Sequence, residues 1–259
     1  MSRTHKALFP FFAFALFLCT FFSHAQAGAA ERRYAALSLI GDALTVVTYQ
    51  PQIGSRLNKN KLERLEVAQG AVDRTALKAL DAALRRDDAK IPVVLLVANA
   101  PNLFEKQERF FAQDRFLAPA EVAAPLTQSG ATHLILLTKH RGETRVVLDG
   151  LSYGSGRLEG LGFYLDDGVT TRAEQTGEEG LGLIAPFLYF RASLIEVASG
   201  KVLASEIVTR TEGVSGALAT KGYGAWEALG EAEKVALLGK LLDGELDRLV
   251  PALTRKPAN

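Results

Sequence analysis

Residues 183–209 read LIAPFLYFRASLIEVASGKVLASEIVT, and this stretch decides the fold. Two apolar segments, residues 183–197 and 202–209, stand on either side of Ser199-Gly200, a dipeptide that favours a tight turn. The pattern predicts an antiparallel β-hairpin. The rest of the sheet must come from segments earlier in the chain.

Five earlier segments have the apolar character of strands: YAALSLI (34–40), ALTVVTY (43–49), IPVVLLVA (91–98), ATHLILLT (131–138) and TRVVL (144–148). We expect the first two to pair as a hairpin across Gly41-Asp42, and the last two to pair across residues 140–142. The segment at 91–98 is apolar without interruption and has the length of one strand.

Helical periodicity separates these strands. Asp73 can cap a helix in which Leu77, Leu80 and Leu84 share one face. The capping-box spacing at residues 102–105 predicts a short helix, and another is expected between Pro119 and Gly130.

The end of the chain, residues 225–253, predicts one long amphipathic helix. Its apolar face is formed by Val235, Leu238, Leu242, Leu246 and Leu249. This face would most simply close the core, with a groove for a partner helix as the alternative.

A helix–glycine–strand step at Gly130 is typical of a βαβ unit, whereas hairpins require antiparallel pairs. The sequence therefore predicts an α/β fold of mixed character over residues 28–259. We expect a single domain with a mixed sheet, two or three hairpins, helices packed on the sheet and a long C-terminal amphipathic helix.

The charge balance argues against a nucleic-acid-binding protein. The chain has 259 residues with 30 Lys and Arg against 29 Asp and Glu, so its net charge is +1. Nucleic-acid binders normally present a strongly basic face. A hydrophobic content of 48% also argues against disorder.

Residues 1–27 have the features of a signal peptide. A positive start at Arg3 and Lys6 precedes an apolar run over residues 7–22, and residues 25–27 (AQA) supply a cleavage pattern near Ala27. The run is shorter than the roughly 20 apolar residues of a membrane-spanning helix. We expect no transmembrane span after processing.

The predicted location is the periplasm of a bacterium. No Asn-x-Ser/Thr acceptor occurs, and the sole cysteine, Cys19, lies inside the leader. The mature chain would therefore have no disulfide and no thiol chemistry. The alternatives are secretion, or a lipid anchor through Cys19, although Leu18 is bulky for a lipoprotein signal.

No catalytic constellation is predicted. Residues 150–154 (GLSYG) match the nucleophile elbow of α/β-hydrolases, but no histidine follows His140 to complete that order. The glycines of residues 154–160 have the wrong spacing for a dinucleotide site, so no cofactor is expected. His133 and His140 lack the spacing and companions of metal ligands, and no metal site is expected.

Residues 150–182 are rich in glycine and acidic residues, and we expect a long loop there that contacts a ligand or partner. The binding candidates are Tyr153, Arg157, Glu159, Tyr164, Asp166 and Asp167. A merely flexible loop and a site for a hard cation are the alternatives.

A second cluster, Arg56, Lys59, Lys61 and Arg64, is basic. It could face an anionic lipid or glycan. Because Glu63 and Glu66 are interleaved with it, a solvated surface is the preferred interpretation.

Residues 187–205 (FLYFRASLIEVASGKVLAS) resemble a hairpin of bacterial envelope accessory proteins, namely the curli-secretion component and the outer-membrane activators of penicillin-binding proteins. Residues 129–134 (SGATHL) are similar to the step before a central strand in those families. The resemblance covers a small part of the chain. It implies an α/β sandwich that works by binding or assembly, without chemistry. The chain departs from these families because it lacks a convincing lipid-attachment cysteine, and no functional residue is carried over to it.

These observations favour an exported, non-catalytic protein that binds another envelope component, with an envelope protein as its expected partner. Two alternatives remain open. One is a periplasmic hydrolase whose acid/base pair comes from carboxylates such as Glu159 and Asp166. The other is a carrier of a small molecule or lipid, which would need a roomy apolar cavity. The sequence leaves the oligomeric state open.

Overall fold

The computed structural model describes residues 32–51, 60–68, 70–172, 177–218 and 225–255. The predicted leader, residues 1–27, lies outside the described residues, as do Arg56 and Lys59 of the basic cluster.

Within the described residues, ten strands form the main sheet, in the order β3-β2-β11-β12-β7-β1-β4, with β13 and β14 paired to β12 and β8 paired to β11. These strands are β1 (Tyr34–Leu39), β2 (Leu44–Thr48), β3 (Lys61–Leu65), β4 (Val93–Leu96), β7 (His133–Lys139), β8 (Arg141–Glu143), β11 (Arg157–Arg172), β12 (Glu179–Glu196), β13 (Val202–Thr211) and β14 (Val214–Ser215).

The remaining elements are two small antiparallel ribbons and the helices. The ribbons pair β5 (Phe111–Ala112) with β6 (Arg115–Phe116) and β9 (Val146–Leu148) with β10 (Leu151–Tyr153). The α-helices are α1 (Ala71–Asp87), α2 (Ala120–Gln128) and α3 (Glu231–Thr254), and short 3-10 helices cover Pro101–Phe104, Gln107–Phe110, Gly216–Leu218 and Ala225–Ala228. None of the described helices combines the length and the apolar character that a membrane span requires.

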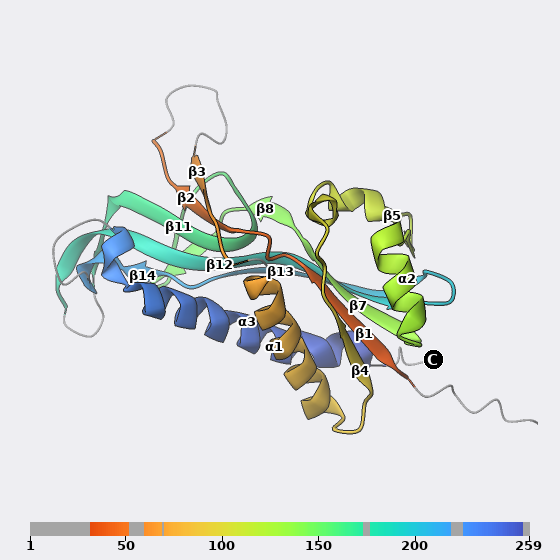
Figure 1. Ribbon diagram of the computed structural model, residues 1–259. Coiled ribbons are helices and arrows are strands. Elements are labelled where there is room, and N and C mark those ends of the chain that lie inside the picture. Colours follow the sequence, from red (N-terminus) through yellow and green to blue (C-terminus); the bar gives the residue numbers. More distant parts are fainter. Residues whose placement is uncertain (1–31, 52–59, 69, 173–176, 219–224, 256–259) are drawn as a thin grey trace, which may run out of the picture. The chain divides into compact units, whose positions relative to one another are not determined.

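Strand β12 is the strand on which the sheet is assembled (Figure 1). One of its edges pairs with β11 and then with β7, and its other edge pairs with β13 and β14. The predicted hairpin is confirmed as β12–β13, with Gly200 in the left-handed region at a φ of 70°.

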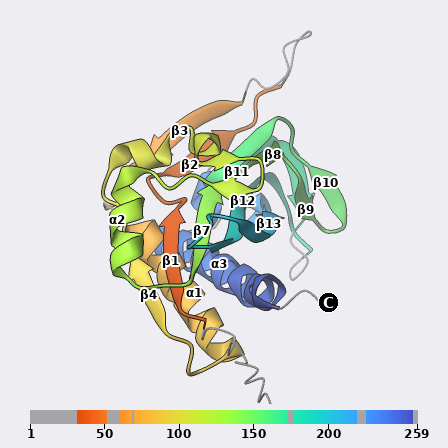
Figure 2. The ribbon, with the colours of Figure 1, turned by 90° about the vertical axis from the view of Figure 1, so that its right-hand side faces the viewer.

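Strands β4, β1 and β7 form the parallel part of the sheet. Alternate residues of β1 point to opposite faces: Ala36 packs toward α1 and α3, whereas Leu37 belongs to the cluster that contains Val122 of α2. Helices therefore cover both faces here, as Figures 1 and 2 show. This confirms the predicted mixed sheet and α/β class.

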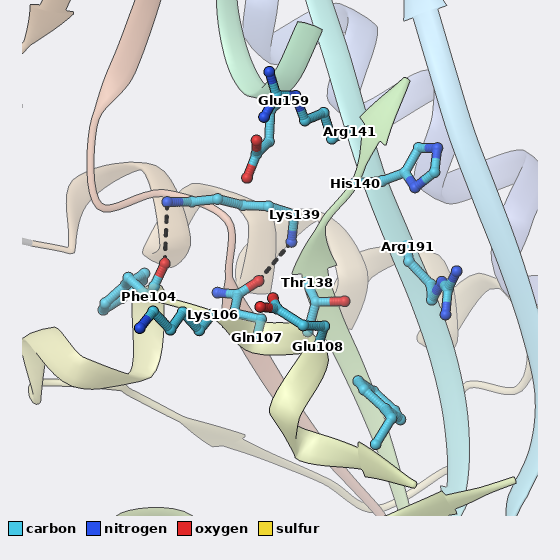
Figure 3. Close-up of a pocket in the computed structure, with 11 residues that line it drawn as sticks. Phe104, Lys106, Gln107, Glu108, Thr138, Lys139, His140, Arg141, Glu159 and Arg191 are labelled. Carbon is cyan, nitrogen blue, oxygen red and sulfur yellow. Dashed lines mark hydrogen bonds between the residues drawn. The ribbon is translucent and has the colours of Figure 1, made fainter. Parts of the chain in front are cut away.

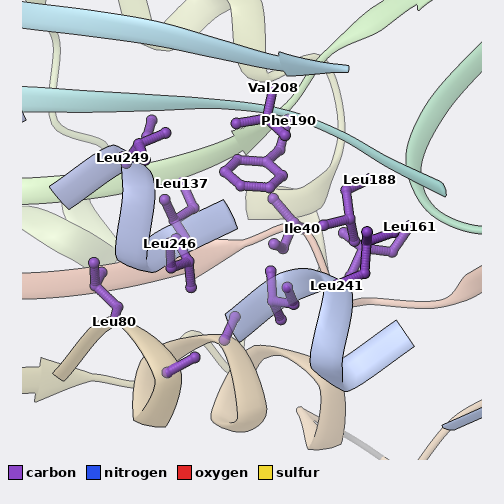
Figure 4. Close-up of a cluster of buried hydrophobic side chains, with 14 of the residues drawn as sticks. Ile40, Leu80, Leu137, Leu161, Leu188, Phe190, Val208, Leu241, Leu246 and Leu249 are labelled. Atoms are coloured by element: carbon purple, nitrogen blue, oxygen red, sulfur yellow. The ribbon is translucent and has the colours of Figure 1, made fainter. Parts of the chain in front are cut away.

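The larger core lies between the sheet and helices α1 and α3, which also contact each other. Figure 4 shows Phe190 and Leu137 of the sheet facing Leu246 of α3, with Leu80 of α1 nearby. The predicted apolar faces of α1 and α3 are confirmed, except at Val235, whose exposed fraction is 68%.

The position of Val235 follows from its neighbour. The Lys234 ammonium lies 4.0 Å from the centre of the Trp226 ring and donates a hydrogen bond to the Leu229 carbonyl at 2.6 Å. These contacts turn Lys234 inward at the first turn of α3, so Val235 points to solvent.

Two predicted hairpins are wrong. Segment 34–40 becomes β1 and pairs with β4 and β7, whereas β2 pairs with β11 and β3. The chain does not reverse at Gly41-Asp42, because the Asp73 carboxylate accepts hydrogen bonds from the Ile40 and Gly41 N–H groups at 3.1 and 3.0 Å. Asp73 thus holds the end of β1 against α1 from the third position of the helix, and Gly70 is the N-cap.

The second wrong hairpin is the one expected across residues 140–142. Strand β7 pairs with β1 and β12, while β8 pairs with β11 and β9 with β10. Strand β1 pairs with one edge of β7 and β12 pairs with the other, so β7 has no free edge for a hairpin partner.

The loop expected at residues 150–182 is also corrected. Strand β11 occupies residues 157–172 and β12 begins at Glu179, with residues 173–176 outside the described part of the chain. The glycines do not indicate a loop here. Gly162 lies where β11 approaches β2 so closely that a Cβ would be 1.8 Å from the Thr45 carbonyl oxygen.

Candidate functional site: a cationic cleft at the carboxyl ends of the parallel strands

The candidate site lies where β7 ends and β11 begins along the same edge of β12. Lys139 is opposite Phe190, and Gly160 is opposite Tyr189, the next residue of β12. The register of β1 and β7 also ends here, at Leu39 and Thr138. Ligands of α/β sheets commonly bind outside the carboxyl ends of parallel strands, and this gap is such a place.

Gln107 bridges the two diverging strands. Its side-chain amide donates to the Leu39 carbonyl of β1 at 2.7 Å and to the Leu103 carbonyl at 3.2 Å, while its oxygen accepts from the Lys139 N–H of β7 at 2.8 Å. Gln107 is buried, and Figure 3 shows it beside Lys139 on the floor of the cleft. It replaces the backbone pairing that the strands lose when they separate.

Replacing Gln107 with leucine is expected to lower the free energy of unfolding by about 1–3 kcal/mol, because buried backbone groups lose their partners. Urea unfolding of the variant measures this. The matched control is Gln128→Leu on the exposed end of α2, which should change stability by less than about 0.5 kcal/mol. Equal effects at the two positions would contradict the bridging role.

A lysine–aspartate–arginine chain forms the inner wall of the cleft. The Lys139 ammonium lies 2.5 Å from the Asp42 carboxylate, which also pairs with Arg64. Lys139 also donates to the Phe104 carbonyl at 3.4 Å. These contacts hold the lysine between the sheet and the 3-10 helix Pro101–Phe104.

Three arginines surround this lysine–aspartate–arginine group, and none of them has a partner among the described residues. Arg141 lies on β8, Arg157 on β11 and Arg191 on β12. Within the described part of the chain, none of the three guanidinium groups forms a hydrogen bond or ion pair. Because Arg141 and Arg157 are exposed and Arg191 is half-buried, all three are available to a ligand.

Two adjoining hollows make up the cleft. One has a volume of about 460 Å³ and the other about 240 Å³, and they share Lys139, Arg141 and Glu159. The cations that line them are Arg64, Lys106, Lys139, Arg141, Arg157 and Arg191, and the anions are Asp42, Glu108 and Glu159. The cleft therefore has a clear excess of positive charge on a chain whose net charge is only +1.

His140 lines the larger hollow as a neutral side chain. Burial lowers its pKa below the usual 6.5, the positive charge of Arg191 lowers it further, and Glu159 opposes both effects. At neutral pH the imidazole can donate and accept hydrogen bonds without adding charge.

The structure brings only two of the predicted binding residues into this cleft, Arg157 and Glu159. Tyr153 lies on β10, beside a separate hollow lined by Thr170 and Arg172. Tyr164 lies outside the cleft, because β11 turns its side chain into the core, where burial raises the pKa of its hydroxyl above the usual value.

The two neighbouring aspartates have structural contacts. Asp166 is buried and its carboxylate accepts a hydrogen bond from the Gly168 N–H at 3.0 Å. Asp167 accepts one from the Ala225 N–H at 3.0 Å and so ties β11 to the 3-10 helix before α3. In the described residues no group of three or more His, Cys, Asp and Glu is placed to hold a metal ion.

The cleft residues that the sequence interpretation missed are chiefly Lys139, Arg141 and Arg191. A signal was present for the first two, because Lys139 ends a buried strand and His140-Arg141 follow it immediately. For Arg191 no local signal exists, since it lies in the middle of β12 and reaches the cleft only through the pairing of β12 with β7.

The structure also separates the carboxylates of the hydrolase alternative. Glu159 and Asp166 lie seven positions apart on β11, which in an extended strand is roughly 23 Å. Paired carboxylates of glycosidases lie about 5–9.5 Å apart. Glu159 is exposed and Asp166 is buried, so the strand does not bring them to one site.

Neither a protein-family model nor a curated protein matches the chain. Several solved structures match the chain at low similarity. A DUF330-family protein from Xanthomonas campestris is 15% identical with a TM-score of 0.40, over 86% of this chain and 83% of that one.

Two other structures have lower TM-scores. The PelC dodecamer from Paraburkholderia phytofirmans is 13% identical with a TM-score of 0.31, over 88% of this chain and 91% of that one. A protein from Chlamydia trachomatis is 12% identical with a TM-score of 0.34, over 86% of this chain and 97% of that one. These values are too low to carry a functional assignment, and the resemblance at residues 187–205 stays a prediction.

Proposed function

We propose that this protein is an exported binding protein without chemistry of its own, and that its cationic cleft binds an anionic group of another envelope component. The observation that carries the proposal is a set of three arginines around one cleft, Arg141, Arg157 and Arg191, that have no partner among the described residues. The group bound would be a phosphate or a carboxylate, because the guanidinium fork matches both.

The electrostatics of the cleft support an anionic ligand. Like charges that converge in a concave site raise the local concentration of counter-ions. The Asp42 carboxylate pairs with both Lys139 and Arg64. Because Arg64 shares the neutralisation of Asp42, the positive charge of Lys139 remains partly available to a ligand. In the part of the chain that the structure describes, the three guanidinium groups form no hydrogen bond or ion pair, and Glu159 and Glu143 lie opposite Arg141 and Arg157 in the β8–β11 register. A ligand oxyanion would supply the further counter-charge.

The polar surroundings support binding rather than catalysis. Ser152 of the GLSYG segment is exposed on the short strand β10, which leads into Gly154 and not into a helix. The hydrolase alternative requires Glu159 and Asp166 to act as a pair. Only Glu159 lies in the cleft, and Asp166 lies seven residues further along β11. For the carrier alternative, the space between the sheet and helices α1 and α3 is filled by apolar side chains such as Phe190 and Leu246.

The proposal is tested by thermal unfolding with inorganic pyrophosphate, citrate and neutral glucose at constant ionic strength. A ligand at 100 times its Kd stabilises the folded state by about 2.7 kcal/mol. For a chain of this size that corresponds to a rise in Tm of roughly 5–10 °C. We expect the rise with at least one of the two anions and not with glucose.

The matched variants are Arg191→Gln in the cleft and Lys240→Gln on the exposed surface of α3, each of which removes one positive charge. The first should weaken anion binding about tenfold or more, which corresponds to about 1.4 kcal/mol, and the second should leave it unchanged. Equal losses in both variants would indicate a general charge effect. That result, or no rise in Tm with either anion, would overturn the proposal.

A further inference from the structure

Strand β4 has the sequence of an interior strand but lies at the edge of the sheet. Residues 91–98 read IPVVLLVA, a continuous apolar run typical of parallel strands that are covered on both sides. Among the described strands, β4 pairs with β1 alone. The exposed fractions are 41% at Val94, 39% at Leu95 and 49% at Val97, the residue that follows the strand.

The exposed side chains lie on both faces of the strand. Val93 packs against the core that contains α1, and Leu96 packs against the cluster on the α2 face. Since side chains alternate along a strand, Leu95 is on the α1 face and Val94 on the α2 face. A neighbouring strand at this edge would therefore cover apolar surface on both faces.

Other edge strands of the main sheet carry charged side chains, unlike β4. Strand β3 carries Lys61, Glu63 and Arg64, and β13 carries Glu206 and Arg210. Charged residues of this kind prevent edge strands from pairing with other chains. Among the described edge strands of the main sheet that are longer than the two-residue β14, β4 alone carries no charged residue.

We propose that the β4 edge pairs with β4 of a second copy of this chain, antiparallel, so that one sheet continues through a two-fold dimer. A two-fold axis perpendicular to the sheet at Val94 or Leu95 places an apolar residue opposite its own copy on the same face. Pairing with β3 or β13 of a second copy would instead place charged side chains beside Val94 and Leu95. The self-pairing is the arrangement in which both edges are apolar.

The expected affinity is modest. Stable dimers usually bury about 1,200–2,000 Å² in total, and a pair of four-residue strands with its flanking side chains is at or below the lower end. We therefore expect dissociation in the micromolar range.

Sedimentation equilibrium of the purified protein from low to high micromolar concentration tests the proposal. The mass should rise toward that of a dimer. The variant Leu95→Lys should remain monomeric throughout, whereas Ile207→Lys, at a comparably exposed position on β13, should associate like the wild type. A monomeric wild type at high micromolar concentration would overturn the proposal, as would a dimeric Leu95→Lys.

Amide hydrogen exchange of the wild type gives a second readout that needs no variant. Protection of the β4 amides should increase with protein concentration, while protection of β13 should not. Val94→Lys replaces Leu95→Lys if circular dichroism shows that the latter is unfolded. Unchanged exchange of β4 over the same concentrations would equally contradict the dimer.

Discussion

Alanine at Gly162 is expected to lower the free energy of unfolding by about 3 kcal/mol or more, at or beyond the usual upper end for overpacking. An added Cβ would lie 1.8 Å from the Thr45 carbonyl oxygen and 2.8 Å from the Thr45 nitrogen. Both atoms belong to the backbone of β2, so no side-chain rotation relieves the clash. Strands β11 and β2 would have to separate, and this would also displace β3, which pairs with β2. Urea unfolding followed by circular dichroism measures the loss.

Gly168→Ala provides a control on the same strand. Gly168 is exposed, and the nearest atom to its added Cβ is an Asp166 side-chain oxygen at the ordinary distance of 3.5 Å. The substitution should change the free energy of unfolding by less than about 1 kcal/mol, as surface substitutions usually do. If Gly162→Ala were as mild as this control, the close approach of β11 and β2 would be wrong.

Alanine at Asp73 is expected to cost about 3 kcal/mol or more, because several buried donors would each lose an acceptor, at about 1–3 kcal/mol apiece. One carboxylate oxygen accepts from the Ser38 hydroxyl at 2.6 Å and from the Ile40 and Gly41 N–H groups. Asparagine keeps an acceptor at this place without a buried charge, so Asp73→Asn should retain most of the stability. Urea unfolding of the two variants at neutral pH separates the hydrogen bonds from the charge.

The ionisation of Asp73 adds a pH dependence of defined sign. Burial raises the pKa of the carboxyl above its usual 3.8, although hydrogen bonds from Ser38, Ile40 and Gly41 oppose the shift. The folded state therefore binds this proton more tightly than the unfolded state. The contribution of Asp73 to the free energy of unfolding falls as the pH rises from 3.8 through the folded-state pKa, and stays low above it.

The difference between the wild type and Asp73→Asn isolates this effect, because all other titrating groups are common to both proteins. The asparagine variant should gain stability relative to the wild type as the pH rises through that range. A difference that does not vary with pH would show that the Asp73 pKa is the same in the folded and unfolded states.

The elements that could be predicted from the sequence are those whose burial follows a local period. Leu77, Leu80 and Leu84 recur at helical spacing, and each is buried in α1. The β12–β13 hairpin was also predictable, since its turn at Ser199-Gly200 is only a few residues from the strands it joins. Both patterns can be recognised from residues that lie close together in the sequence.

The strand partners of β1 and β7 could not be predicted in this way. Tyr34 is opposite His133, so the pairing joins positions about a hundred residues apart and leaves no turn signal between them. The same distance explains the incomplete site prediction. Arg157 and Glu159 were found because they lie in one polar stretch, whereas Arg191 is an isolated charge in an apolar strand.

The sequence alone determined the class of fold, the helix faces and the central hairpin, because hydrophobic periodicity and turn chemistry act between near neighbours. Tertiary structure alone decided that β7 and β11 meet on one edge of β12, that the cleft is cationic, and that the apolar strand β4 lies at an edge. Those features depend on backbone pairing between distant segments. Such pairing is selected by the burial of the whole sheet, and no short stretch of residues encodes it.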